Sequence, residues 1–305
     1  MSMDIPFDPV THNRAAWDRL VAEDNEWTRP VSSEAVDRAR AGDWSIVLIG
    51  YQPVDTSWFP STLVGVDVLC LAGGGGQQGP ILAAAGATVT VFDNSPSQLA
   101  RDDLVAARDN LEISTVLGDM RDLSAFGDNA FDLIVNPVSN VFCPDLGPVW
   151  QECHRVLRPG GQLLVGFINP DVYIFDYAAL DSRGEFIVRH PLPYSDVRDL
   201  STDEREAAFG PNGAVEYSHS MAEQIGGQLA DGFVLTGFQQ APHQSSPTAR
   251  YLPGYFATRA IKPARPIDAV ETPEDPPRVV RAPSTTSDDS PPVRYARTTV
   301  GPNAV

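Results

Sequence analysis

A run of glycines after residue 72 is the part of this 305-residue chain that most plainly suggests chemistry. The segment Ala72-Gly73-Gly74-Gly75-Gly76-Gln77-Gln78-Gly79 follows an apolar stretch and opens a helix-like one. Glycines let the backbone turn tightly and approach a ligand closely, and free N–H groups at a helix start favour anionic or polar groups. The spacing Gly74-x-Gly76-x-x-Gly79 also matches the fingerprint of dinucleotide-binding loops.

A carboxylate follows the glycine run at the spacing expected of a ribose-binding acid. Asp93 ends the next strand-like stretch, and the two oxygens of a carboxylate can accept hydrogen bonds from both ribose hydroxyls. The structural alternative is that Asp93 caps the helix that follows it. Nicotinamide, flavin and S-adenosylmethionine sites share such a loop, so these residues alone leave the cofactor open.

Alternating strand-like and helix-like stretches surround these residues and would position them. The strands are predicted from short apolar runs flanked by Gly, Asp or Pro, over Val66–Leu71, Thr88–Phe92, Ile113–Leu117, Phe131–Asn136 and Gln162–Ile168. The helices are predicted over Gln78–Ala85, Pro96–Asn110 and Leu146–Leu157. This order predicts a doubly wound α/β sheet that binds ligands at the carboxyl ends of its strands.

The flanking regions break this rhythm. We expect an N-terminal helical cap over residues 1–62, a cofactor-binding domain over 63–263 and an insertion at 170–217 within it. A helix over Ser220–Ala230 and strands over Phe233–Phe238 and Tyr255–Ile261 would close the domain. Residues 264–305 contain eight prolines and no Leu, Phe, Trp, Met or Cys, which predicts a disordered Pro-rich tail.

Composition excludes several classes of protein. The chain has 22 Lys and Arg against 40 Asp and Glu, and its formal charge of −18 argues against a nucleic-acid partner. It has neither a secretory signal at its start nor an apolar run of about 18 residues, so we expect no membrane partner. Three cysteines without a CxxC pair suit a reducing cytoplasm and suggest neither a disulfide scaffold nor a metal site.

Three further motifs narrow the cofactor. Gly118-Asp119-Met120 follows the third predicted strand, Phe131-Asp132-Leu133-Ile134 forms the fourth, and Arg155-Val156-Leu157-Arg158-Pro159-Gly160-Gly161 leads into the fifth. With the glycine run and Asp93, this series resembles class I S-adenosylmethionine-dependent methyltransferases. The resemblance extends from about Leu63 to Ile168 and is closest to the bacterial small-molecule enzymes of the type 11-like group.

The resemblance implies a seven-stranded Rossmann-like sheet whose last strand is antiparallel, with S-adenosylmethionine lying across the first and second strand ends. The glycine run would pass under the methionine part, Asp93 would bind the ribose, Asp119 would bind the adenine amino group, and Met120 would pack on the ring. The residues carried over as cofactor-binding are Ala72, Gly73, Gly74, Gly75, Gln77, Gln78, Asp93, Asn94, Ser95, Asp119, Met120, Asn136, Pro137 and Val138.

One departure from the family pattern concerns the amino-acid end of the cofactor. The family usually has an acid where Cys70 stands and a glycine where Ala72 stands. The ammonium group would then depend on backbone carbonyls, water or Asn140.

The acceptor side is predicted from scattered residues. Methyl transfer is an in-line displacement that needs a general base only if the nucleophile arrives protonated. His219 is our candidate base, although a histidine at a helix start can equally be a cap. The other residues assigned to acceptor binding are Trp27, Asn140, Tyr173 and Tyr194. We place the acceptor pocket above Asn136–Asn140, between the N-terminal segment and an aromatic lid at Asp171–Tyr194, with core packing as the alternative for the lid's aromatic residues.

The function predicted is therefore methyl transfer from S-adenosylmethionine to an unidentified small molecule, without a metal. The alternatives are an NAD(P)-dependent oxidoreductase and a cofactor-binding module without catalysis. The oxidoreductase is disfavoured because no lysine precedes Lys262, so the chain has no Tyr-x-x-x-Lys pair. The sequence leaves open the acceptor and the oligomeric state.

Overall fold

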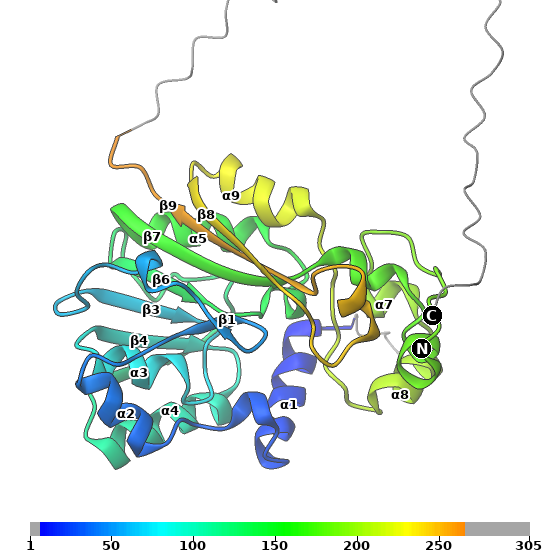
Figure 1. Cartoon of the computed structure of the whole chain (residues 1–305), viewed down its shortest axis with the longest axis horizontal. Coiled ribbons are helices and arrows are strands. Elements are labelled where there is room, and N and C mark those ends of the chain that lie inside the picture. Colours follow the sequence, from blue (N-terminus) through cyan, green and yellow to red (C-terminus); the bar gives the residue numbers. More distant parts are fainter. Residues whose placement is uncertain (1–6, 266–305) are drawn as a thin grey trace, which may run out of the picture. The chain divides into compact units, whose positions relative to one another are not determined.

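A seven-stranded sheet forms the centre of the computed structural model, which describes residues 7–265 (Figure 1). Its strands lie in the order β5-β4-β3-β6-β7-β9-β8, and β9 runs antiparallel to both of its neighbours. The strands are β3 (Asp67–Leu71), β4 (Thr88–Asp93), β5 (Ile113–Leu117), β6 (Phe131–Asn136), β7 (Leu157–Ile168), β8 (Val234–Ala241) and β9 (Tyr255–Ile261). The predicted fold class, with seven strands and an antiparallel last one, is confirmed.

Each face of the sheet is covered by its own helices because successive strand residues point to opposite faces. Val68 and Cys70 of β3 pack with α2 (Ser33–Arg40), α3 (Gln78–Ala84) and α4 (Pro96–Asp109). Leu69 and Leu71 pack on the other face with α5 (Gly147–Val156) and the segment that leads to α9 (Gly227–Ala230). The result is the three-layered arrangement of a doubly wound sheet.

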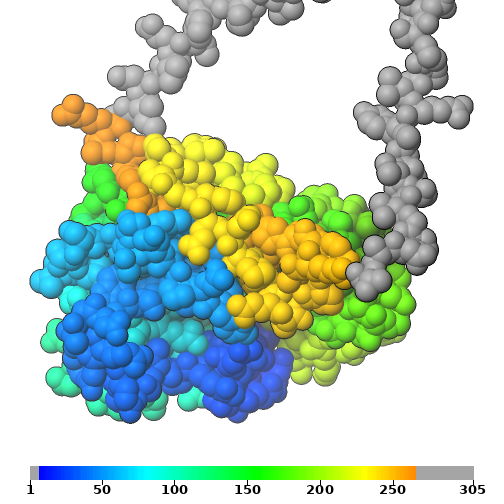
Figure 2. All heavy atoms as spheres, in the orientation of Figure 1, coloured from blue at the N-terminus to red at the C-terminus, as the bar shows by residue number. Residues whose placement is uncertain are grey.

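Two segments outside this sheet close the ends of its parallel strands (Figure 1). One is α1 (Pro9–Ala22), which begins at the N-cap Asp8. The other is the insertion, whose helices are α6 (Tyr177–Arg183), α7 (Asp196–Asp199) and α8 (Thr202–Phe209). Figure 2 shows the N-terminal residues, in blue, meeting later residues, in yellow and orange, along this side of the molecule.

The N-terminal segment differs from the helical cap predicted for residues 1–62. It contains a short hairpin of β1 (Val47–Ile49) and β2 (Gln52–Pro53). The hairpin packs on β7, where a Cβ atom on Gly166 would lie 2.3 Å from the carbonyl oxygen of Leu48. Only glycine allows β1 to approach β7 this closely, so the segment is part of the main core.

Two boundaries in the second half of the domain also differ from prediction. β7 begins at Leu157 instead of Gln162, because Leu157 already pairs with Phe131 of β6. The helix predicted over Ser220–Ala230 contains a π-helical turn at Ala222–Gly226. At this turn the indole Nε1 of Trp150 donates a hydrogen bond of 2.9 Å to the carbonyl oxygen of Glu223.

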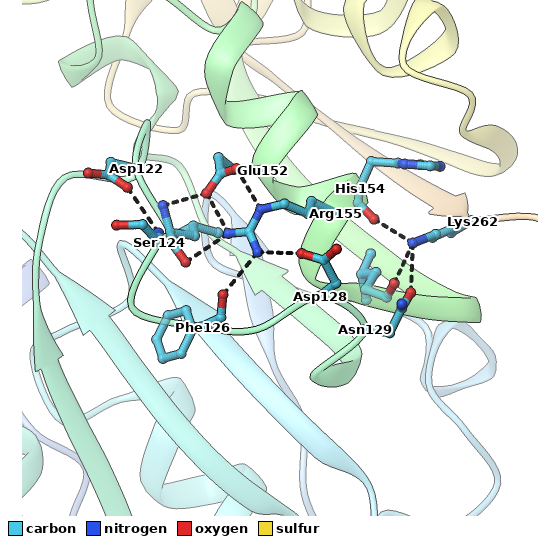
Figure 3. A network of polar contacts seen from close by, with 11 residues as sticks. Asp122, Ser124, Phe126, Asp128, Asn129, Glu152, His154, Arg155 and Lys262 are labelled. Atoms are coloured by element: carbon cyan, nitrogen blue, oxygen red, sulfur yellow. Dashed lines mark hydrogen bonds and ion pairs between the residues drawn. The ribbon is translucent and has the colours of Figure 1, made fainter.

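The connection from β5 to β6 has no helix and is held by Arg155 of α5 instead (Figure 3). The guanidinium group donates to the carbonyl oxygens of Leu123 and Phe126, and forms ion pairs with Asp128 and Glu152. Because this connection starts at the end of β5, the network also fixes the backbone that leads away from Asp119.

Two sequence predictions concern residues that the structure describes only in part. The predicted tail, residues 264–305, lies outside the described residues except for its first two, and so does the start of the chain through Pro6. Within residues 7–265, no helix is long and apolar enough to cross a membrane.

Candidate active site

The glycine run forms a tight loop at the end of β3. Gly75 and Gly76 have φ angles of 111° and 70°, in the left-handed region that favours glycine. A Cβ atom on Gly74 would lie 2.7 Å from the Cβ of Gln98 and 3.0 Å from Oδ2 of Asp93. The loop therefore needs glycine for its backbone angles at two positions and for close packing at a third.

Two carboxylates hold this loop by its backbone. Oδ2 of Asp93 accepts a hydrogen bond of 3.0 Å from the Gly74 N–H. Oδ2 of Asp102, on α4, accepts hydrogen bonds of 3.0 Å from the N–H groups of both Gly75 and Gly76. The shape of the loop is thus held by hydrogen bonds within the protein, and its amides are divided between two acids.

Asp102 is a functional residue that the sequence analysis missed. It is fully buried, and this burial raises the pKa of its carboxyl group to about 7. The available signal was its place on the buried stripe of α4, three residues after Leu99 and three before Val105. An acid on such a stripe requires partners, because a buried charge without hydrogen bonds is strongly destabilising.

Asp93 lies at the end of β4, where a carboxylate can reach a ligand in the cavity. It lines the cavity described below, and burial raises the pKa of its carboxyl group. Its Oδ1 also accepts a hydrogen bond of 2.9 Å from the N–H of Ser95, and Ser95, not Asp93, is the N-cap of α4. A carboxylate oxygen can accept two hydrogen bonds, which leaves both oxygens free for one more.

A cavity of about 1150 Å³ opens where the carboxyl ends of β3, β4 and β6 meet α1 and the insertion. This volume exceeds the 300–1,000 Å³ that is typical of one small-molecule site, so a cofactor and a second molecule can fit together. The predicted residues that line it are Trp27, Ala72, Gly73, Gly74, Gln77, Gln78, Asp93, Asn94, Asp119, Met120, Pro137 and Val138.

Three predicted cofactor residues do not line the cavity. Gly75 is held by Asp102, as described above. Ser95 is buried as the N-cap of α4, where its hydroxyl oxygen accepts the Gln98 N–H at 3.1 Å. Asn136 is also buried, and its Oδ1 accepts a hydrogen bond of 3.2 Å from the Ser139 hydroxyl. Local hydrogen bonds thus engage the Gly75 N–H, the Ser95 hydroxyl and Oδ1 of Asn136.

The N-terminal segment is fastened to the rim of the cavity by the amide side chains that line it. Gln77 donates to the carbonyl oxygen of Arg29 at 3.1 Å, and Gln78 donates to that of Val47 at 3.3 Å. Asn94 accepts a hydrogen bond of 2.9 Å from Arg14 of α1. These contacts join the glycine loop and the end of β4 to the segment that covers them.

His219, the predicted base, does not line the cavity. Its side chain is buried, and Nε2 lies 2.7 Å from the carbonyl oxygen of Cys143 and 3.1 Å from that of Asn140. Nε2 must therefore carry a proton and donate it to these carbonyls. Burial lowers the pKa of the imidazole. The prediction of His219 as the base is not supported, because the ring fastens the turn after β6 to the end of the insertion.

Asn140 also turns away from the cavity. Its side chain is fully buried, and Nδ2 donates a hydrogen bond of 2.8 Å to Oε1 of Gln224. Because Asn140 is not among the residues that line the cavity, we assign the ammonium end of the cofactor to backbone carbonyls and water.

Tyr173 and Tyr194 stand behind the cavity wall instead of forming it. Their rings stack 5.5 Å apart, and their hydroxyls donate hydrogen bonds of 2.6 Å to Glu216 and Asp196. The insertion lines the cavity through Phe209–Ala214 and through Glu216. The predicted lid is therefore a support for residues that the sequence analysis did not select.

The lining also includes residues that the sequence analysis did not use as ligands. His243–Ser245 and Tyr255 come from β9 and the loop before it, and Tyr51 comes from the N-terminal hairpin. The Trp27 and Tyr51 rings lie 5.3 Å apart, and those of His243 and Tyr255 stack 5.1 Å apart. In the described part of the chain, no cluster of three His, Cys, Asp or Glu residues could hold a metal ion.

Comparisons with known proteins show methyltransferase relatives. The methyltransferase domain model matches residues 69–165. The protein named uncharacterized methyltransferase YbaJ of Bacillus subtilis is 46% identical over 253 residues, which cover 83% of this chain and 98% of that protein.

Solved structures with low sequence identity share the fold. An S-adenosylmethionine-dependent methyltransferase from Mesorhizobium loti has a TM-score of 0.52 at 18% identity, covering 67% of this chain and 94% of that one. A didemethyltoxoflavin N1-methyltransferase from Burkholderia thailandensis, solved with S-adenosylhomocysteine, has a TM-score of 0.50 at 17% identity, covering 86% and 93%.

Proposed function

Because this chain belongs to the class I S-adenosylmethionine-dependent methyltransferases, we propose that it methylates a small organic molecule bound beside the cofactor in the cavity. S-adenosylmethionine is its methyl donor, as in the family, and this assignment sets aside the nicotinamide alternative. The observation that carries the proposal is the cavity of about 1150 Å³, which joins the glycine loop to a second half lined by the end of the insertion, the loop before β9 and the N-terminal hairpin.

The cofactor half would hold S-adenosylmethionine through residues already placed in the wall. Asp93 would accept hydrogen bonds from the ribose hydroxyls, Asp119 would bind the adenine amino group, and Met120 would pack on the ring. The methionine part would lie against Ala72–Gly74, with Gln77 and Gln78 beside it and Pro137 and Val138 nearest the sulfonium. Gly74 supports this fit because it lines the cavity and its N–H holds the Asp93 carboxylate in place beside the loop.

A buried polar atom supports the same fit. Gln98 lines this half of the cavity, and its enclosed Oε1 has no hydrogen-bond partner among the described residues. Such an atom is costly when no ligand or water pairs with it. A hydroxyl or amino group of the cofactor would supply the missing donor.

The reaction depends on alignment more than on acid–base strength. The bound donor supplies a methyl group that is already activated on a positively charged sulfur. The protein would hold the acceptor in line with that methyl group and exclude water. The aromatic rings of Trp27, Tyr51 and Tyr255 give the second half of the cavity the surface for this task.

Calorimetry and a labelled transfer assay test the proposal together. Titration should show binding of S-adenosylmethionine and S-adenosylhomocysteine and none of NAD or NADP. Label from the methyl donor should then enter the small-molecule fraction of a bacterial extract. Incorporation only into protein or nucleic acid would contradict the small-molecule acceptor, and tight NAD binding without a response to the methyl donor would contradict the cofactor site.

A further inference from the structure

We propose that Glu216 accepts the proton of the methyl acceptor, and that this acceptor is a neutral or cationic molecule that reacts through an O–H or N–H group. The inference rests on the proposed function, because it concerns the second half of the same cavity. It assigns the role that His219 does not fill to a carboxylate in the cavity wall.

The backbone at Glu216 is fixed from both sides. Its N–H donates a hydrogen bond of 2.7 Å to Oδ2 of Asp196, and its carbonyl oxygen accepts one of 3.0 Å from the Asp196 N–H. The next residue, Tyr217, donates its N–H to the carbonyl oxygen of Val141 at 2.8 Å. These bonds join the end of the insertion to α7 and to the turn after β6, so the position of Glu216 is set before any ligand binds.

The carboxylate itself has one oxygen engaged and one available. Oε2 accepts a hydrogen bond of 2.6 Å from the Tyr173 hydroxyl. Within residues 7–265 no hydrogen bond reaches Oε1, and this atom is not among the enclosed polar atoms that lack a partner. Glu216 lines the cavity, so Oε1 is the oxygen that can meet an acceptor. The arrangement resembles a base oriented by a second group, which is the usual organisation of a proton acceptor.

The surroundings of Glu216 suit a base that works near neutral pH. Burial raises the pKa of this carboxyl group to about 7, the negative charge of Asp196 adds to the effect, and the hydrogen bond from Tyr173 opposes it. The other titratable groups around it are Tyr177 and Tyr194 of the insertion and Tyr255 of β9. On the far side of Asp196, Arg205 and His190 act on that residue.

The charges that line the cavity restrict the acceptor. Five acids line it, namely Glu23, Glu26, Asp93, Asp119 and Glu216, against the single guanidinium of Arg19. Asp119 is paired with Arg121 at 2.6 Å, and Glu23 is paired with Arg19 at 3.7 Å. The remaining acids would repel a carboxylate or phosphate, whereas a neutral or cationic molecule meets no such cost.

The proton and the electrons balance in a single displacement. The O–H or N–H bond of the acceptor breaks toward Oε1 of Glu216, and its electron pair forms the bond to the methyl carbon. The pair of the broken carbon–sulfur bond stays on sulfur, which becomes a neutral thioether. Glu216 then holds the proton and releases it to water after the product leaves.

The test compares Glu216→Gln with the parent and with a matched control in the labelled transfer assay, at pH values on both sides of 7. The amide keeps the shape of the side chain and can still accept from Tyr173, but it cannot take a proton. Glu206→Gln changes an exposed carboxylate on α8 and is the matched control. We expect Glu216→Gln to lose about 100-fold or more in kcat, with the S-adenosylmethionine affinity within about twofold of the parent, whereas Glu206→Gln keeps the parental rate.

The pH profile separates a base from a merely structural residue. The parental kcat should fall as the pH drops below about 7, which gives the pH profile an acidic limb. The residual activity of Glu216→Gln should not show this acidic limb. Tyr173→Phe removes a hydrogen bond that lowers the pKa of Glu216, so its limb should move to higher pH.

Three results would overturn the inference while leaving the proposed function intact. These are a parental rate and profile in Glu216→Gln, loss of the acidic limb in His243→Gln instead, and a labelled product whose acceptor is an anion. Absence of label from the small-molecule fraction with the parent enzyme would contradict the proposed function itself.

Discussion

On the β3–β4 side of the cavity carboxylates bind backbone N–H groups, whereas on the insertion side they bind the hydroxyls of tyrosine side chains as well. Asp93 and Asp102 hold the loop at Gly74–Gly76. Glu216 and Asp196 accept from Tyr173 and Tyr194. Backbone donors stay in place whatever side chains a relative carries, but tyrosine hydroxyls can be exchanged by mutation. The glycine-loop side thus depends on two acids and a fixed backbone, whereas the insertion side also depends on two acid–tyrosine pairs.

The largest effect on stability should come from removing the Asp102 carboxylate, which accepts the hydrogen bonds from the glycine loop. Asp102→Ala removes the acceptor of two buried N–H groups, and we expect a loss of about 3 kcal/mol in the free energy of unfolding at pH 7. Urea unfolding monitored by circular dichroism measures this loss. Asp102→Asn is the control, since its neutral amide oxygen can still accept from the loop, and it should be no less stable than the parent at this pH. Equal losses in the two variants would contradict the role given to these bonds.

Removing the carboxylate that faces the ligand should affect binding more than folding. We expect Asp93→Ala to weaken S-adenosylmethionine binding by about 1.5–3 kcal/mol, the range for hydrogen bonds to a charged group. Calorimetry on the purified variant measures this. The variant should also lose a smaller amount of stability, because Asp93 binds the N–H groups of Gly74 and Ser95. An affinity within about twofold of the parent, well short of that range, would show that Asp93 does not bind the ribose.

The pH dependence of the free energy of unfolding should differ between the parent, which has a buried acid at Asp102, and the Asp102→Asn variant. The pKa of Asp102 rises from 3.8 to about 7 on folding, so the folded chain holds the proton more tightly than the unfolded chain does. Stability from this group is present below about pH 4 and is lost as the pH rises through about 7. The parent should therefore lose stability relative to Asp102→Asn over this window. A difference between the two proteins that does not change with pH would contradict the assignment.

The smallest effect is expected at the aromatic rim of the acceptor half. The Trp27 side chain is 43% exposed and lines the cavity beside Tyr51. Trp27→Ala should lower the turnover of the acceptor more than the affinity for S-adenosylmethionine, because the ring contributes surface to the second half alone. Steady-state kinetics and calorimetry on the same preparation compare the two. A selective loss of cofactor affinity would contradict this assignment and would indicate that Trp27 contacts the cofactor instead of the acceptor.

The shape of the glycine-loop side of the cavity could be predicted from the sequence because its signals are local. Val68–Leu71 alternates between two cores, Asp93 ends a strand, and the glycine run follows another, so each position depends on residues close by in the chain. Asp102 was missed because an acid on a helix usually faces solvent. Its place between Leu99 and Val105 on the buried stripe was the evidence to the contrary.

The acceptor half could not be predicted because distant contacts decide which way its side chains point. Val215 is fixed by the side chain of Asn13 at 2.8 Å, and Tyr217 by the carbonyl oxygen of Val141. Together these bonds turn Glu216 into the cavity. His219 shows the same dependence, since its ring nitrogen is taken by carbonyls from the turn after β6. No spacing within the insertion carries this information.

A crystal structure of the complex with S-adenosylhomocysteine tests the central claim most directly, because it locates both halves of the cavity in one measurement. The account predicts that the ribose hydroxyls lie within hydrogen-bond distance of the Asp93 carboxylate, and that Oε1 of Glu216 faces the open space beside the sulfur atom. A ribose bound away from Asp93, or a Glu216 carboxylate separated from the sulfur by the body of the cofactor, would contradict it.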